Sequence, residues 1–184
     1  AAVYFEQCLR EHPDRAYALD ELERRGLVPG SDATADEALR AFRIGYAPSG
    51  WDGLANYLRQ QGISPLSGEA TGLLVPRSAG AGHYDRFRHR LMFAVVDLQG
   101  RVVAFSGRAL PPMPGDEPKE KPAKYINSPE SPVYTKGNQL FGLFQARAGI
   151  RAASSAVLVE GNFDVVSLHA RGIAHPRLGV RVLE

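Results

Sequence analysis

The sequence predicts a mixed α/β fold that consists of a helical lead-in, an α+β part built on a β-hairpin, and a final strand and helix. Three observations lead to this prediction. Apolar residues recur at helical spacing in the first third of the chain, the period shortens to that of strands after Leu73, and an apolar run ending in an acid precedes another helical pattern near residue 160. A hydrophobic composition of 44% allows such a chain to bury a globular core.

Four helices are expected in the first third, because four segments each carry one apolar stripe at three- and four-residue spacing. They contain residues 4–9, 16–25, 32–42 and 49–60. Gly26 is a suitable left-handed end for the second helix. Ser49 is a suitable N-cap for the fourth, which would place Trp51 on its apolar stripe. We interpret this region as scaffold.

A β-hairpin is expected next. Its strands are Leu91–Asp97 and Arg101–Ala109, joined at residues 98–100. The proline-rich segment 111–122 is expected as a surface loop, since proline prevents regular structure there. Helical spacing returns over residues 138–147.

A strand, a tight turn and a helix are expected toward the end of the chain. The strand is Ala156–Glu160, the helix is Phe163–Ala170, and Gly172 is a suitable end for the helix. This order of elements opens a parallel α/β unit.

The composition excludes several classes of protein. Cys8 is the only cysteine, so neither an internal disulfide nor a cysteine-based zinc site can form within these residues. The sequence has no apolar run of the roughly 20 residues that a membrane span needs, and its start lacks the pattern of a signal peptide. We therefore expect a cytoplasmic protein that does not enter a membrane.

The formal net charge of +2 conceals an uneven distribution. Residues 1–85 contain 8 basic and 12 acidic side chains, whereas residues 86–151 contain 11 basic and 5 acidic ones. A basic middle segment is what phosphate binding requires, because each neutralised phosphate releases counterions. An ordinary solvated charged surface would have the same composition.

Two acids mark the predicted strand, turn and helix. Glu160 ends the strand, so its carboxylate is expected at the edge of a parallel sheet where ligands bind. Asp164 follows one helical turn later and could face the same edge. Paired carboxylates suit hard cations such as Mg²⁺. The alternative is that Glu160 caps the helix and Asp164 forms a surface pair.

Basic residues form the second candidate constellation. Arg86, Arg88 and Arg90 alternate, which would place all three on one face of a strand. Arg108, Lys124 with Tyr125, and Lys136 could extend this surface; arginine offers a planar fork to phosphate, and lysine a point charge. Phe87, Tyr125 and Tyr134 could stack on bases or belong to the core. A solvated edge strand would also carry alternating arginines.

Five stretches resemble, in order and at similar spacing, the motifs of bacterial replicative DNA primases. They are YDRFRHRLMF from Tyr84, GRVVAFSGRAL from Gly100, KYINSPESP from Lys124, KGNQLFGL from Lys136 and VEGNFDVVSL from Val159. Upstream, residues 43–47 and Trp51 are similar to the helical lead-in of that family. The resemblance covers nearly the whole sequence from residue 1 to about residue 173.

The resemblance implies a template-directed RNA polymerase that makes short RNA primers on single-stranded DNA. The expected partners are the DNA template, nucleoside triphosphates and, for the full-length protein, a replicative helicase at the nucleoid. The expected cofactor is Mg²⁺ or Mn²⁺, with no zinc in these residues. Residues 1–140 would form the N-terminal subdomain of the polymerase core, and residues 141–184 would begin a Toprim domain.

The resemblance also assigns site residues by position. Those expected to contact nucleotide or template are Arg86, Arg88, Arg108, Lys124, Tyr125, Asn127 and Lys136. Glu160 matches the Toprim glutamate, and Asp164 matches an acid near it, so both are expected to be catalytic and to associate with metal.

The sequence departs from the family pattern in three places. The cysteines of the preceding zinc-binding domain are missing, and so is the Asp-x-Asp motif of the Toprim domain, so we expect an inactive fragment. Residues 174–184 do not match the expected strand and turn. Apolar residues from Val157 to Leu168 would lack part of their sheet, so the last forty or so residues are expected to be the least stable.

Two other functions remain open at this point. Another Toprim enzyme, such as a topoisomerase or nuclease, would leave the Arg86 and Lys124 motifs unexplained. A non-catalytic module that binds single-stranded DNA or nucleotide through Arg86, Arg88 and Lys124 would explain those motifs without polymerase activity.

Overall fold

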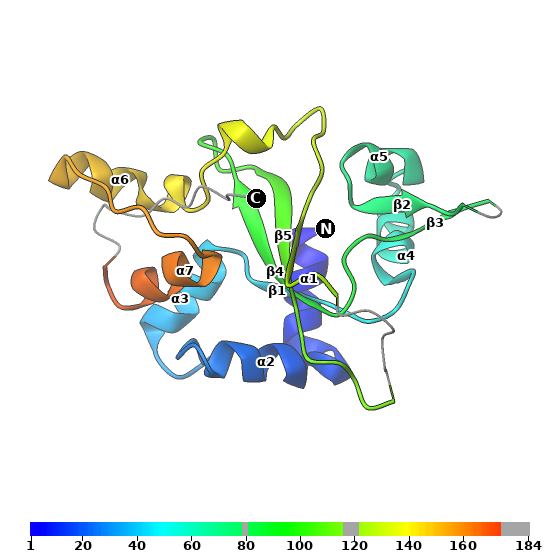
Figure 1. Ribbon diagram of the computed structural model, residues 1–184, viewed down its shortest axis with the longest axis horizontal. Coiled ribbons are helices and arrows are strands. Elements are labelled where there is room, and N and C mark those ends of the chain that lie inside the picture. The colour runs from blue at the N-terminus through cyan, green and yellow to red at the C-terminus, as the bar shows by residue number, and fades with distance from the viewer. Residues whose placement is uncertain (79–80, 116–121, 174–184) are drawn as a thin grey trace.

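The computed structural model describes residues 1–78, 81–115 and 122–173. Its centre is a four-stranded antiparallel sheet in the order β1-β4-β5-β6 (Figure 1). The strands are β1 (Gly45–Ala47), β4 (Arg90–Val96), β5 (Val102–Ala109) and β6 (Tyr125–Asn127). The mixed α/β class is therefore confirmed.

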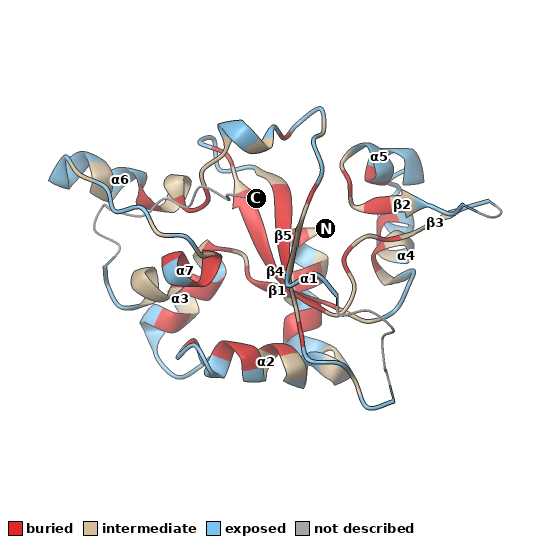
Figure 2. Ribbon diagram, in the orientation of Figure 1, coloured by how far each residue is buried: buried red, intermediate tan, exposed pale blue. Residues whose placement is uncertain are grey.

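The predicted β-hairpin is confirmed as β4 and β5. In its register Leu91 pairs with Arg108 and Phe93 with Ser106, and the register shifts between Val95 and Val96. Almost all of β4 is buried, because helices and loops cover both faces of the sheet (Figure 2). Successive side chains of a strand point to opposite faces, so the two faces have separate cores.

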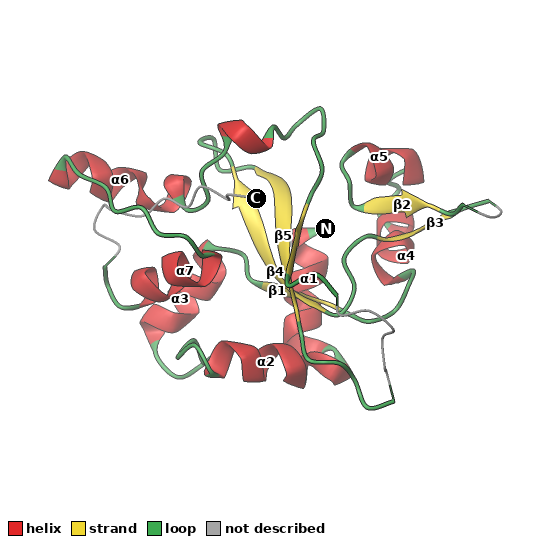
Figure 3. Ribbon diagram, in the orientation of Figure 1, coloured by secondary structure: helices red, strands yellow, loops and turns green. Residues whose placement is uncertain are grey.

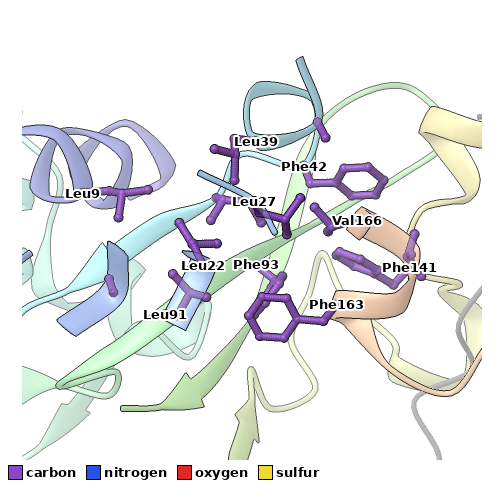
Figure 4. Close-up of a cluster of buried hydrophobic side chains, with 14 of the residues drawn as sticks. Leu9, Leu22, Leu27, Leu39, Phe42, Leu91, Phe93, Phe141, Phe163 and Val166 are labelled. Carbon is purple, nitrogen blue, oxygen red and sulfur yellow. The ribbon is translucent and has the colours of Figure 1, made fainter. Parts of the chain in front are cut away.

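One face of the sheet packs against α2 (Ala16–Glu23), α3 (Ala33–Ala41) and α7 (Asn162–Ala170). Four phenylalanine rings meet in this core, with the Phe93 and Phe163 rings 5.1 Å apart and the Phe42 and Phe141 rings 5.4 Å apart (Figure 4). This packing holds α7 beside α3 and against β4, although more than a hundred residues separate the two helices.

The other face packs against α4 (Gly53–Gln60) and a small hairpin of β2 (Leu74–Pro76) and β3 (His83–Asp85). Next to them lies α5 (Pro65–Ala70), and these elements form the right side of the molecule (Figure 3). The core of this side contains Phe5, Leu54, Leu74, Phe87 and Phe105. Phe87 is therefore a core residue and cannot stack on a base.

Helix α1 (Ala2–Glu11) contributes to both cores and lies against β1. The approach is so close that a Cβ at Gly45 would lie 2.6 Å from the backbone of Phe5. Glycine is required there because any side chain would push α1 off the sheet.

The fourth predicted helix begins later than expected. Ser49 does not cap it, and α4 starts at Gly53. The cap comes from Asp85 instead, whose carboxylate accepts hydrogen bonds from Leu54 N at 2.7 Å and Ala55 N at 2.9 Å. Sequence spacing missed this cap because Asp85 is distant along the chain.

The other expected helices are confirmed with shifted ends. Gly26 and Gly172 have φ of +68° and +71°, as expected of residues that follow helices. The helix expected over residues 138–147 is α6 (Leu143–Ala153), preceded by the 3₁₀ turn η2 (Lys136–Asn138). A second 3₁₀ turn, η1 (Pro13–Arg15), precedes α2. The described parts of the proline-rich segment, 111–115 and 122, contain no helix or strand.

The strand expected over Ala156–Glu160 is wrong for the part of the chain that the structure describes. Leu158 alone is a bridge residue, and this segment belongs to neither sheet. A strand is stable only with neighbours, and Val157 and Leu158 are 38% and 71% exposed here. The expectations for residues 174–184 lie outside the described residues. None of the described helices is long and apolar enough to cross a membrane.

The cap on α4 yields a stability prediction. Asp85→Ala removes both acceptors and is expected to lower the free energy of unfolding by roughly 1–2 kcal/mol, the usual contribution of an N-cap. Asp52→Ala is the control, since Asp52 occupies the N-cap position without a capping bond and forms only a surface ion pair with Arg77. Urea unfolding measures both. An equal loss in the two variants would contradict the assignment of the cap.

The packing of α7 on α3 yields a prediction about pH. Burial lowers the pKa of His169 below its ordinary value of 6.5, and Glu37 opposes this only in part. The unfolded chain therefore binds the His169 proton more readily, so the free energy of unfolding should fall as pH drops through about 6.5. His169→Gln is expected to remove this part of the pH dependence in urea unfolding. An unchanged pH profile in the variant would rule out His169 as its source.

Candidate nucleic-acid interface

An exposed aromatic and a stacked arginine form the first candidate surface, which we call the Trp51 platform: Trp51, Tyr84 and Arg88. The Trp51 side chain is 54% exposed. The Arg88 guanidinium carbon lies 3.8 Å from the centroid of the Trp51 ring and 5.3 Å from that of Tyr84. The two rings meet edge to face at 5.4 Å. The platform therefore presents a π-face beside a fixed positive charge.

Asp85 holds the Trp51 platform in place. Its backbone N–H donates to Trp51 O at 2.7 Å, and its backbone carbonyl accepts from Arg88 Nη1 at 2.9 Å. Its carboxylate caps α4, and burial raises the pKa of this carboxyl although two N–H groups donate to it. Burial also lowers the pKa of Arg88. One residue thus connects α4, β3 and the platform.

The sequence interpretation of Trp51 as part of a helix stripe is wrong, because α4 begins two residues after it. The signal that could have corrected this is its position between Gly50 and Asp52, which favours a turn.

Arg86, Arg88 and Arg90, which were expected on one face of a strand, do not share one. Strand β4 begins only at Arg90, and His89, with φ of +49°, interrupts the alternation. Arg90 is buried and its Nη1 donates to Gly107 O and Ala123 O, both at 3.0 Å. Arg86 is half-buried, with Nε unpartnered in the described part of the chain. Only Arg88 belongs to the platform.

A second surface, which we call the arginine cluster, lies on the opposite side of the sheet and consists of Glu21, Arg24, Arg25, Arg108 and Phe163. The buried Glu21 carboxylate pairs with all three arginines, with N–O separations of 3.1, 3.6 and 2.9 Å respectively. The Arg25 and Arg108 guanidinium carbons lie 4.9 and 5.4 Å from the Phe163 ring. Sequence reasoning found Arg108 and missed Arg25, because Arg25 was read as a helix end.

The predicted residues of β6 lie beside Arg108. Tyr125 pairs with Arg108 in the sheet, and its hydroxyl accepts from Arg108 Nη1 at 3.2 Å. Asn127 is half-buried two residues further on. Lys124 is exposed, and its carbonyl accepts from Ala109 N. These residues gather at one end of β5.

Lys136 is not brought to that end. It begins η2, and its neighbours Gly137 and Asn138 line a pocket with residues 97–99, at the turn between β4 and β5. Its backbone N–H donates to the Glu130 carboxylate at 2.9 Å. Tyr134 nearby is buried, so it serves packing.

The two acids lie at the start of α7. Glu160 is exposed, whereas Asp164 accepts a hydrogen bond from Gly161 N at 3.1 Å and so stabilises the first turn of the helix. In residues 1–78, 81–115 and 122–173, no three acidic, histidine or cysteine side chains group so as to hold a metal ion. Mg²⁺ commonly binds one or two protein carboxylates together with substrate phosphates, so these two acids would need such further ligands to hold a divalent cation.

The sheet separates the positively charged side chains into two groups, one on each of its sides. Phe163 follows Glu160 by three residues and contacts Arg25 and Arg108, so the arginine cluster lies against α7, the helix that carries Asp164 and follows Glu160. Tyr84 of the Trp51 platform lies in β3 and Trp51 precedes α4, and both elements lie on the side of the second core (Figure 1). The positive charges thus occupy two surfaces instead of one.

Comparisons with known proteins found matches over most of this chain. A sequence model described as DNA primase catalytic core, N-terminal domain, matches residues 4–147. The DNA primase of Synechococcus elongatus is 47% identical over 176 residues, which are 95% of this chain and 23% of that protein. The chain spans about a quarter of the length of the curated relatives it matches.

Solved structures resemble the whole chain. The RNA polymerase domain of Mycobacterium tuberculosis primase DnaG in complex with double-stranded DNA has a TM-score of 0.83 and 32% identity, over 100% of this chain and 52% of that one. A DnaG primase catalytic domain bound to single-stranded DNA has a TM-score of 0.76 and 34% identity, over 100% of this chain and 53% of that one.

The different surroundings of Arg88 and Arg90 yield a prediction. Arg90→Met removes the buried donor that Gly107 O and Ala123 O share and is expected to lower the free energy of unfolding by about 2–3 kcal/mol. Arg88→Ala, which removes a half-buried stacked side chain, is expected to cost less. Urea unfolding measures both variants. A larger loss for Arg88→Ala would show that Arg88 is the structural arginine of the pair.

Proposed function

This chain belongs to the family of DNA primase catalytic cores, of which it matches the N-terminal domain, and we propose that it binds the single-stranded template during primer synthesis. The observation that carries this proposal is the Trp51 platform. A tryptophan that is more than half exposed, with an arginine 3.8 Å from its ring, offers a base a stacking surface and a phosphate a cation.

The proposed template path continues from the platform along one edge of the molecule. Arg88 would contact a phosphate at the platform, and Arg86, two residues earlier in the chain, would contact another. Lys124 would supply a compact charge at the end of β6, and Tyr125 and Asn127 would contact nucleotide there. Arg108 would contact nucleotide from the arginine cluster, and Lys136 would act near the other end of β5.

Primer synthesis itself is proposed for the whole protein, because this chain spans about a quarter of its relatives. There, residues 141–184 would begin a Toprim domain, and Glu160 and Asp164 would serve the catalytic centre with Mg²⁺ or Mn²⁺. Such ions neutralise developing charge in nucleotidyl transfer. Nucleoside triphosphates would be the substrates, and a replicative helicase at the nucleoid the partner.

The template proposal is tested by fluorescence anisotropy with a labelled single-stranded oligonucleotide. Trp51→Ala and Arg88→Ala are each expected to weaken binding by roughly 5- to 140-fold, since one stacked base contributes about 1–3 kcal/mol. The control is Arg40→Ala, which removes an equal charge from an exposed site on α3. Arg88→Ala should also reduce the slope of log K against log salt concentration by about 0.7, because one phosphate contact is lost. Trp51→Ala should leave this slope unchanged.

Equal small effects in all three variants would show that the platform does not bind the template. In the whole protein, primer synthesis is expected to fall with Trp51→Ala and Arg88→Ala, and with Glu160→Gln even at saturating template. Unchanged synthesis in all of these variants would remove the assignment of a primer-synthesis site to this chain.

A further inference from the structure

The arginine cluster is organised around one buried carboxylate. Glu21 is 5% exposed and lies in the middle of α2, next to the core residue Leu22. A buried carboxylate is costly unless cations and hydrogen bonds compensate it. Arg24 Nη1 donates to Glu21 Oε2 at 3.1 Å, and Arg108 Nε lies 2.9 Å from Glu21 Oε1. The cluster contains three guanidinium groups for one carboxylate, so positive charge remains available.

Arg108 is held from several directions but keeps donors for a ligand. The pair with Glu21 Oε1 does not have hydrogen-bonding geometry at Nε, so it acts as an ion pair. One Nη1 hydrogen bond goes to Tyr125, and the rings of Tyr125 and Phe163 lie 5.6 and 5.4 Å from the guanidinium carbon. A guanidinium has five N–H donors, so most of them are not used within the described part of the chain.

Arg25 extends the same arrangement toward the surface. Its side chain is 40% exposed, its Nε lies 3.6 Å from Glu21 Oε1, and its guanidinium lies over the Phe163 ring. Arg25 and Arg108 thus share both the Glu21 oxygen and the Phe163 ring, although Arg25 follows the end of α2 and Arg108 lies in β5. The shared contacts set the orientation of the two guanidinium groups relative to each other.

From this geometry we infer that Glu21 is a positioning residue, which orients Arg25 and Arg108 to bind the phosphates of a nucleotide or template. The inference rests on the function proposed above. Long arginine side chains lose conformational entropy when they bind an anion. The contacts with Glu21 already restrict the rotamers of Arg25 and Arg108, so less entropy is lost on binding. Glu21 also lowers the positive potential, so its charge and its positioning act on anion affinity in opposite directions.

These opposite signs make the inference testable with Glu21→Gln and the control Glu23→Gln. Both remove one negative charge from α2, but Glu23 is exposed. Affinity for inorganic triphosphate and for a single-stranded oligonucleotide is measured by calorimetry. Glu21→Gln is expected to weaken triphosphate binding by roughly 5- to 10-fold despite the lost negative charge, whereas Glu23→Gln leaves it unchanged or slightly tighter. Triphosphate binding by Glu21→Gln that is as tight as in the control would overturn the inference.

A double-mutant cycle separates positioning from general stability. If Glu21 acts through Arg25 and Arg108, Glu21→Gln should have little further effect on triphosphate binding in a background that carries both Arg25→Ala and Arg108→Ala. Additive effects would overturn the inference. Should Glu21→Gln fail to fold, Glu21→Asp replaces it, since it keeps the charge but shortens the reach. Weaker triphosphate binding by folded Glu21→Asp supports positioning, and wild-type binding overturns it.

The outcomes also distinguish this inference from the proposed function. If the unsubstituted chain binds neither triphosphate nor oligonucleotide, the proposed function fails and the inference fails with it. If the unsubstituted chain binds the oligonucleotide through Trp51 while Glu21→Gln binds triphosphate normally, the function stands and only the inference fails.

Discussion

The carboxylate and backbone of Asp85 form the contact on which the candidate interface depends. This residue caps α4, accepts the Arg88 guanidinium and donates to the Trp51 carbonyl. It is buried, so water cannot replace these bonds at low cost. Two segments more than thirty residues apart are therefore held in one arrangement, with the exposed indole beside a stacked cation. Without the bonds to Asp85, these contacts would no longer hold Trp51 and Arg88 next to each other.

Burial separates the arginines of this chain into different roles. Arg90 lies inside the molecule and satisfies two carbonyls, so it connects β4 to β5 and to the start of the β6 segment. Arg88 lies at the surface and is stacked, which leaves its charge accessible. Arg108 lies between these extremes, 15% exposed and paired with a buried acid. Arginines in neighbouring motifs thus differ in role according to their exposure to water. Arg90 serves packing, Arg88 is accessible for binding, and Arg108 is partly buried in an ion pair.

The sheet also explains why the positive charges form two surfaces. Its two faces are covered by different elements, α2, α3 and α7 on one side and α4 with β2 and β3 on the other. The arginine cluster belongs to the first side and the Trp51 platform to the second. Strand β6 is an edge strand of this sheet, and its residues Tyr125 and Asn127 lie beside β5, which carries Arg108.

The sequence by itself determined the elements with a strong hydrophobic period, such as the β4–β5 hairpin and α7, and the motifs that place the chain in its family. Only the tertiary structure decided that Trp51 is exposed, that Arg90 is buried, and that Arg25 and Arg108 meet at Glu21. It also decided that residues 156–160 join neither sheet. The physical reason is that period and propensity are properties of neighbouring residues, whereas burial, caps and strand pairing depend on partners that lie far away along the chain.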